Sequence, residues 1–316
     1  MSKSAKVELL SFSWASQFTV HALFKSLAFI CQVTWGFIES DFFTFAIPNT
    51  LFGIIGALAA SSLIHGPPPL AIDVLQRSPL VLVFNFISLL MFDLSNQRSL
   101  ESVEEDRINK PWRPIPSGQV TPEQTRKVML LTAPFVLGFY YLLGISKQGL
   151  LVQFLSWYYN DLKGGDEVFR DAIIAASYGL ANVTSLRLAV GSESAVSQHG
   201  YVWISMVSAV ILTTMHIQDL KDQEGDHIRG RKTVPLVFGD RTARFAIAVS
   251  VPFWSYACAS FWRLSYGLYP LPTVLGLLVA LRVLTKRSPL EDRRTWRLWC
   301  LWHASLYPLP LLSNLN

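Results

Sequence analysis

The chain has 316 residues, of which 51% are hydrophobic and 16% charged, and its mean hydropathy is +0.34. Soluble domains carry about 25% charged residues, so the composition favours a membrane protein with several spans over a soluble enzyme. The net charge of +5 could suggest nucleic-acid binding. The distribution of the charges, described below, argues against a nucleic-acid partner, and nothing in the sequence points to an obligate protein partner.

The first 40 residues are predicted to form a tail and an amphipathic helix on the membrane surface. Residues 15–37 are apolar but contain Gln17, His21, Lys25 and Gln32. This pattern is typical of a helix that lies in the interface, and a tenth span is the alternative.

Residues 41–316 are predicted to form one transmembrane domain, an all-α bundle of nine helices. The fourth apolar segment is shorter than the ~20 residues that a span needs, so it is tilted, partial or extended at its end. The nine segments cover residues 43–63, 78–97, 127–145, 148–158, 171–190, 200–218, 243–262, 267–284 and 297–313.

The basic residues predict the orientation of this bundle. With nine spans and a cytoplasmic N-terminus, all but four of the 27 Lys and Arg fall on the cytoplasmic side. The exceptions are Arg77, Lys147, Arg187 and Arg263. The positive-inside rule therefore favours this topology. We expect the surrounding lipid bilayer to be that of the endoplasmic reticulum or another intracellular membrane.

Two acidic clusters stand on that cytoplasmic side, at the ends of the second and sixth segments. In the later cluster, Asp219, Asp222 and Asp226 are spaced i, i+3, i+7, which places them on one face of a helix that Gly225 is expected to limit. Three carboxylates on one face repel each other unless a cation neutralises them, and Mg²⁺ prefers such oxygen ligands. A solvated helix end is the simpler alternative.

The earlier cluster is less regular. Asp93 and Asn96 share a helix face, and a helix that continued past them would bring later acidic residues to the same face, until Pro111 ends it. The spacing leaves open which of these later residues point at a metal ion. The candidates are Glu101, Glu104, Glu105 and Asp106.

Each acidic cluster is followed by basic residues that could bind a diphosphate. These candidates are Lys110, Arg113, Arg231 and Lys232. A diphosphate that leaves an isoprenoid chain leaves a carbocation behind, which needs a water-poor chamber lined by aromatic rings. Polar residues inside a span are also functional candidates, because their burial is costly. Weak candidates for this chamber are Phe92, Tyr158, Tyr178, Asn182 and His216, although packing explains His216 equally well.

The sequence from Asp106 to Gly118 and the sequence from Asp219 to Pro235 together resemble the two signature motifs of the UbiA superfamily of membrane prenyltransferases. This resemblance implies that residues 41–316 form a catalytic domain of nine transmembrane helices around a central cavity. It also implies Mg²⁺ and a prenyl diphosphate substrate. The first motif departs from the family pattern. Two extra residues separate Asn96 from Asp106, and Ser102 replaces the middle Asp, for which Glu101 or Glu105 could substitute.

The sequence from Ser40 to Gly53 and the sequence from Phe92 to Gln97 are similar to a fungal branch of the superfamily that includes membrane-bound class I terpene cyclases. We therefore expect Mg²⁺-dependent ionisation of a linear isoprenoid diphosphate, followed by cyclisation within the cavity. The alternative is an intermolecular prenyltransferase with an aromatic or other acceptor. The sequence fixes neither the chain length of the substrate nor its product or acceptor.

Overall fold

A computed structural model describes residues 25–191, 194–264 and 270–313 of the chain. These residues are almost entirely helical, as the sequence predicts. The long helices are α2 (Ile47–Leu58), α4 (Ala71–Asn96), α6 (Pro122–Leu142), α7 (Ser146–Asn160), α8 (Arg170–Val190), α9 (Gln198–Thr214), α12 (Asp240–Phe261), α13 (Pro270–Thr285) and α14 (Pro289–Ser305).

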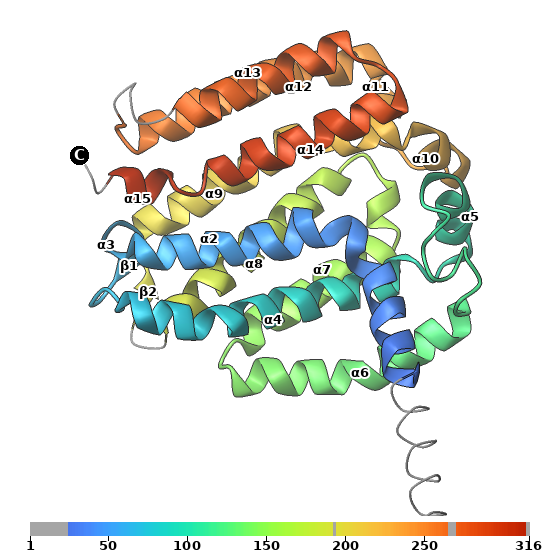
Figure 1. Ribbon diagram of the computed structural model, residues 1–316, viewed down its shortest axis with the longest axis horizontal. Coiled ribbons are helices and arrows are strands. Elements are labelled where there is room, and N and C mark those ends of the chain that lie inside the picture. The colour runs from blue at the N-terminus through green and yellow to red at the C-terminus, as the bar shows by residue number, and fades with distance from the viewer. Residues whose placement is uncertain (1–24, 192–193, 265–269, 314–316) are drawn as a thin grey trace, which may run out of the picture.

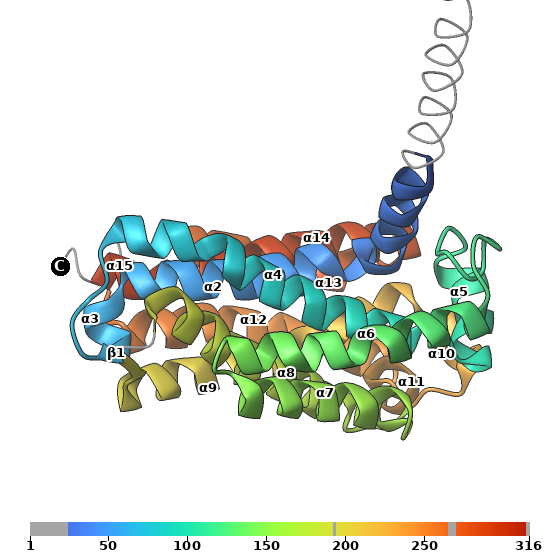
Figure 2. The same cartoon turned by 90° about the horizontal axis from the view of Figure 1, so that it is seen from below.

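Short elements connect these helices at the two ends of the bundle (Figures 1 and 2). One end carries α5 (Leu100–Asn109), α10 (Gln223–Arg229) and α11 (Val234–Phe238). The other end carries α3 (Ala60–Leu63), α15 (Leu309–Ser313) and the antiparallel pair β1 (Ile64–His65) and β2 (Ala195–Val196). The remaining short elements are the π-helix η1 (Phe42–Ala46) and the 3₁₀ helices η2 (Gly164–Asp166) and η3 (Met215–Lys221).

Each of the nine predicted segments overlaps one of these long helices, and residues 267–269 of the eighth segment lie outside the described residues. Four helices in the described part of the chain are long and apolar enough to cross a membrane, namely Lys25–Leu58, Ala71–Asn96, Arg170–Val190 and Gln198–Lys221. Several such helices are what an integral membrane protein requires. The number of nine spans and the orientation of the bundle stay predictions.

The N-terminal part differs from the sequence prediction in one respect. A separate surface helix was expected before a first span at residue 43, but one helix runs without a break from Lys25 to Leu58. The π-turn of η1 interrupts its regular hydrogen bonding, and the start of the helix points away from the bundle (Figure 2). Apolar side chains at this start are exposed, with Leu27 and Ile30 at 50% and 57%, whereas Phe37 and Ile38 are buried against the bundle. Residues 15–24 of the predicted interfacial helix lie outside the described residues.

Small and polar residues let the central helices approach closely. A Cβ on Gly53 would lie 2.6 Å from the backbone carbon of Ser185, so α2 and α8 meet at a distance that only glycine permits. Beside this contact, the Asn85 amide of α4 donates to Thr50 Oγ1 at 3.1 Å and to Ser185 Oγ at 2.9 Å. The buried hydrogen bonds therefore join α2, α4 and α8 around the centre.

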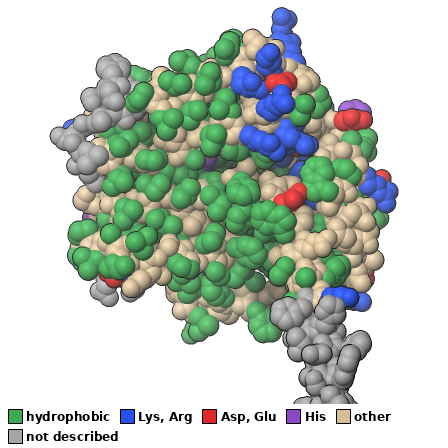
Figure 3. All heavy atoms as spheres, in the orientation of Figure 1, with side chains coloured by type: hydrophobic (Ala, Val, Ile, Leu, Met, Phe, Trp, Pro, Cys, Tyr) green, Lys and Arg blue, Asp and Glu red, His purple; other side chains and the backbone are tan. Residues whose placement is uncertain are grey.

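Hydrophobic side chains cover most of the face seen in Figure 3, and Lys and Arg gather toward one end of it. Many large side chains of the bundle are exposed, among them Phe135 at 79% and Leu131 at 70% on α6. An apolar surface of this extent is unusual for a soluble monomer, because it would drive aggregation in water. In a lipid bilayer the same surface is solvated by acyl chains.

Candidate active site

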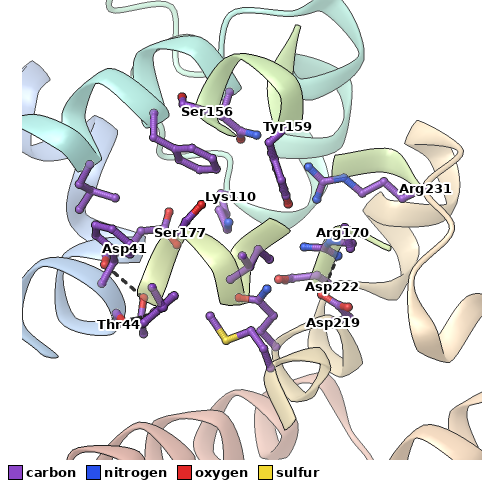
Figure 4. A pocket seen from close by; sticks show the side chains of 18 of the residues that line it. Asp41, Thr44, Lys110, Ser156, Tyr159, Arg170, Ser177, Asp219, Asp222 and Arg231 are labelled. Atoms are coloured by element: carbon purple, nitrogen blue, oxygen red, sulfur yellow. Dashed lines mark hydrogen bonds and ion pairs between the residues drawn. The ribbon is translucent and has the colours of Figure 1, made fainter. Parts of the chain in front are cut away.

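A cavity opens between η1, α4, α7, α8 and η3, at the end of the bundle that carries α5 and α10 (Figure 4). Its empty space is about 1060 Å³, part of which is open to the outside. Its wall contains both charged side chains and apolar or aromatic ones. The charged residues in the wall are Asp41, Glu105, Lys110, Arg113, Arg170, Asp219, Asp222, Asp226 and Arg231.

The second acidic cluster lines this cavity, but its backbone is not the single helix that the i, i+3, i+7 spacing predicts. Asp219 lies in the 3₁₀ helix η3, Asp222 forms the junction, and Asp226 lies in α10. Gly225 was expected to limit the helix and instead lies inside α10, where a Cβ would come within 2.2 Å of Asn109. The close packing of α5 on α10 therefore explains the glycine.

The first acidic cluster is divided between two helices, so the predicted continuous helix is wrong. α4 ends at Asn96, and Ser99 then caps α5 by accepting a hydrogen bond from the Ser102 backbone N–H at 3.1 Å. A serine N-cap satisfies the free N–H groups of a new helix and so favours the break. The break turns Glu105 into the cavity.

The other acidic candidates of this cluster lie elsewhere. Glu101 is exposed and pairs with Lys163 at 2.9 Å, and Glu104 is exposed and pairs with Arg107. Asn96 lines the cavity and donates to Asn160 at 2.8 Å.

Asp106 and Asp93 are buried behind the cavity wall rather than in it. Asp106 accepts from Arg113 Nη1 at 3.1 and 3.0 Å through its two oxygens, and Asp41 Oδ2 lies 3.2 Å from Arg113 Nη2. Two carboxylates thus hold the Arg113 guanidinium, which does line the cavity. Asp93 sits beside Gln97, and its Oδ2 has no hydrogen-bond partner among the described residues.

The cations of the cavity differ in how they are held. Arg170 Nη1 lies 2.9 Å from Asp219 Oδ1, and both side chains are buried. Arg231 Nη1 lies 2.9 Å from Glu105 Oε1 and 3.2 Å from Asp226 Oδ1. Lys110 lines the cavity without an ion-pair partner in the described part of the chain. Lys232 is outside the cavity, exposed and paired with Glu167 at 2.8 Å.

The electric field of these cations offsets the burial of two acids. Burial by itself would raise the pKa of Glu105, but Arg231, Arg229 and Lys110 hold it below its usual value. Burial also opposes the neighbouring cations at Asp222, where Lys221 and Lys110 outweigh it and lower the pKa. At Asp226, burial and the charge of the neighbouring Asp219 outweigh the cations and raise the pKa to about 7. The cavity therefore holds a carboxyl group that a further cation would keep ionised.

Aromatic and apolar side chains form the rest of the cavity wall. The predicted candidates Phe92 and Tyr178 both line the cavity. Phe92 packs on Tyr159, with ring centroids 5.3 Å apart. The Tyr178 hydroxyl donates to the Thr44 carbonyl oxygen. Tyr159, not Tyr158, faces the cavity, since Tyr158 stacks on Phe169 at 6.3 Å.

Two predicted polar candidates are not in the wall. Asn182 is fully buried one helical turn beyond Tyr178, and both of its amide atoms have no partner among the described residues. His216 is buried with its Nδ1 3.9 Å from Asp171, and its Nε2 is unpartnered in the same part of the chain.

The donor set of the cavity fits Mg²⁺. Among residues 25–191, 194–264 and 270–313, no three His, Cys, Asp or Glu side chains are close enough to hold a metal ion on their own. However, the buried Oδ2 atoms of Asp219 and Asp226 have no hydrogen-bond partner there. Acids also outnumber bases in the wall, by five to four. Mg²⁺ commonly binds through one or two carboxylates and completes its shell with phosphate oxygens and water.

The sequence reasoning missed Asp41, Arg170 and Tyr159. Arg170 was counted only as a cytoplasmic charge, yet it begins α8 and pairs with Asp219. A signal was available for Asp41, because it directly precedes the aromatic run Phe42–Ala46 at the entry of the first predicted span. No spacing rule connects Asp41, Tyr159 or Arg170 with the acidic clusters, because they are far from these clusters in the chain.

A family model matches residues 46–304, described as the UbiA prenyltransferase family. The chain belongs to this family. A Somaliensene A/B synthase from Streptomyces somaliensis is 32% identical over 291 residues, which cover 88% of this chain and 93% of the relative. A "Polyprenyl transferase eriF" from Hericium erinaceus is 30% identical over 283 residues, covering 87% of this chain and 92% of the relative.

A solved UbiA homolog from Archaeoglobus fulgidus, bound to GPP and Mg²⁺, is similar in fold. Its TM-score is 0.57 at 12% identity, over 88% of this chain and 99% of the homolog. The UbiA membership makes the protein an enzyme that acts on prenyl diphosphates, related both to terpene synthases and to prenyltransferases.

Proposed function

We propose that this protein is a membrane-bound class I terpene cyclase that converts a linear isoprenoid diphosphate into a cyclic terpene and diphosphate. The observation that carries the proposal is that a set of charged side chains and a set of aromatic and apolar side chains line the same cavity. The charged set suits a diphosphate, and the aromatic set suits a hydrocarbon chain and a carbocation.

The charged set would hold the diphosphate through guanidinium and ammonium groups. Lys110 has no ion-pair partner among the described residues, while Arg113, Arg170 and Arg231 are oriented by carboxylates. Mg²⁺ would be held by Asp219, Asp222 and Asp226, with Glu105 and Asn96 beside them, and it would neutralise charge on the phosphate oxygens. Without such a cation, the excess of carboxylates would repel the substrate.

The reaction begins when the C–O bond to the diphosphate breaks and its electron pair leaves with the phosphate oxygen. The basic side chains stabilise this developing negative charge. The allylic cation that remains lies against Phe92, Tyr159 and Tyr178, whose ring faces contribute ~0.5–2 kcal/mol each. A distal double bond of the same chain then attacks the cation and closes a ring, and loss of a proton gives the alkene.

A second candidate function is transfer of the prenyl group to a separate acceptor. The similarity to a polyprenyl transferase over most of the chain favours this reading. Ionisation is shared by both reactions, so the charged set of the cavity serves either one equally.

The two functions separate when no acceptor is supplied. Membranes that contain the protein are incubated with Mg²⁺ and a C10, C15 or C20 diphosphate, and the products are extracted for mass spectrometry. A cyclic hydrocarbon from one of these substrates supports the cyclase. Diphosphate release that begins only when an aromatic acceptor is added refutes the cyclase and supports the transferase.

A matched pair of variants tests the charged set itself. Glu105→Gln removes a carboxylate from the cavity wall, and Glu101→Gln removes one outside it, four residues earlier on the same helix. We expect Glu105→Gln to lower Mg²⁺-dependent diphosphate release at least ~10-fold, as loss of a charged contact would, and Glu101→Gln to change it less than about two-fold. Equal effects of the two variants would remove Glu105 from the site.

The orientation of the site follows from the same charges. We propose nine spans, with the charged end of the cavity facing the cytoplasm from the endoplasmic reticulum or another intracellular membrane. The basic residues that flank α5, α10 and α13 support this assignment through the positive-inside rule. A protease-accessibility assay on sealed vesicles with a tag after residue 118 tests it.

A further inference from the structure

The connection between α7 and α8 carries a carboxylate that no motif includes. Asp166 ends the 3₁₀ helix η2, and its Oδ1 lies 2.8 Å from Arg229 Nε and 3.4 Å from Arg231 Nε. Its backbone oxygen also accepts a hydrogen bond from the Lys232 N–H at 2.7 Å. The α7–α8 connection is thereby tied to the segment that follows the second acidic cluster.

Asp166 belongs to a compact group of four charged side chains from three parts of the chain. Glu105 Oε2 lies 2.9 Å from Arg229 Nη1, and Glu105 Oε1 lies 2.9 Å from Arg231 Nη1. Both arginines are almost fully buried, and each has a partner in Asp166. A buried arginine is held in one geometry only when its hydrogen bonds are satisfied, so the two carboxylates fix both guanidinium groups.

Of the two arginines in this group, Arg231 lines the cavity (Figure 4) and Arg229 does not. Its backbone is fixed by a glycine turn, in which Gly230 has φ +79° and the Arg231 N–H donates to the Asp226 carbonyl oxygen at 2.9 Å. Its side chain is held at Nε by Asp166 and at Nη1 by Glu105 and Asp226. Nη2 has no hydrogen-bond partner in the described part of the chain and remains able to donate to a ligand.

The three carboxylates around Arg231 differ in one respect. Glu105 and Asp226 line the cavity, where a magnesium diphosphate would compete for them, whereas Asp166 does not line it. A partner outside the cavity keeps its hydrogen bond when the ligand arrives. Asp166 is therefore suited to hold the guanidinium plane while the other contacts rearrange.

We propose that Asp166 is a positioning residue that aims Arg231 at the diphosphate, a role that rests on the proposed function of the cavity. The acid acts from the α7–α8 connection, and it couples this connection to both acidic clusters through the Arg229–Glu105 pair.

The test measures binding of Mg²⁺ with inorganic diphosphate to purified protein in detergent, which requires no turnover. Asp166→Ala is expected to weaken this binding about 10-fold and to raise the KM for the prenyl diphosphate, because a charge-assisted contact is lost. The matched control is Glu167→Ala, which removes the neighbouring acid from its exposed pair with Lys232. It is expected to change binding less than about two-fold.

A double-mutant cycle separates positioning from a purely structural role. In an Arg231→Ala background, Asp166→Ala is expected to add less than about two-fold, since its effect passes through Arg231. An equal loss in both backgrounds, or a lower melting temperature with unchanged binding, overturns the proposal. If Asp166→Ala does not fold, Asp166→Asn keeps the shape and removes the charge, and wild-type binding by that variant overturns the proposal as well.

The outcomes also separate this inference from the function on which it rests. A wild-type protein that binds magnesium diphosphate but forms no cyclic product refutes the cyclase and leaves the role of Asp166 to be decided by the binding of the variants. A wild-type protein that binds no magnesium diphosphate refutes both.

Discussion

Replacement of Gly225 by alanine tests whether the packing of α5 on α10 brings the two acidic clusters together. The added Cβ would lie 2.2 Å from Asn109 Nδ2, 2.5 Å from its Cγ and 2.7 Å from its Oδ1. Ordinary contact begins at 3.4 Å, so one of the two sides must move by about 1 Å. The Asn109 side chain is not free to move without loss, because its Nδ2 donates to the Asp222 carbonyl oxygen at 3.1 Å.

Two responses are possible, and both disturb the site. If Asn109 rotates away, the loss of its hydrogen bond costs about 1 kcal/mol and releases the Asp222 backbone. If the helices separate, overpacking costs about 1–3 kcal/mol and shifts Glu105 away from Asp222 and Asp226. A displacement of about 1 Å in a catalytic group can cost up to about 100-fold, so we expect diphosphate release to fall about 10- to 100-fold.

The assay is Mg²⁺-dependent diphosphate release from detergent-solubilised protein, with the melting temperature recorded for each variant. In a Gly225→Ala background, Asn109→Ala removes the clashing atoms, so part of the lost stability should return. Gly138→Ala is the matched control, since a Cβ at that helical glycine meets nothing within 4 Å. A Gly225→Ala protein with wild-type activity and melting temperature would refute the proposed role of this contact.

Three further predictions concern packing, charge and metal. Gly53→Ala should lower the free energy of unfolding by about 1–3 kcal/mol, because its Cβ would meet the Ser185 backbone at 2.6 Å, whereas Gly138→Ala should leave the melting temperature unchanged or raise it. Arg170→Ala leaves Asp219 buried without its ion-pair partner, so denaturation should show a loss of about 3–5 kcal/mol; stability equal to wild type would contradict this. Chelation of divalent ions should abolish turnover, and Asp222→Asn should raise the Mg²⁺ concentration needed for half-maximal rate; unchanged turnover in a chelator would exclude the metal.

The sequence and the structure agree most closely where hydrophobicity decides the outcome. Each predicted apolar segment overlaps a long helix, because a run of apolar residues must satisfy its backbone internally once it leaves water. The agreement weakens at the helix ends. Neither the Ser99 cap nor the 3₁₀ turn before Asp222 was predicted, and both depend on a few local hydrogen bonds.

The site residues also divide into those that local spacing predicted and those that it could not. The three aspartates of the second cluster were predicted from their spacing and do line the cavity, although two different helices and a junction present them. For the first cluster, the spacing could not choose between Glu101 and Glu105, because the choice depends on where α5 begins.

The sequence alone determined that this protein is a helical membrane protein of the UbiA type with acidic and basic clusters at one end. Apolar segments and short motifs are local properties, so they can be read without knowing what packs against them. Only the tertiary structure decided that Asp41, Asp166 and Arg170 form ion pairs with charged residues of the cavity wall. These partners come from segments up to 72 residues away in the chain, and distance in the sequence carries no information about which side chains meet.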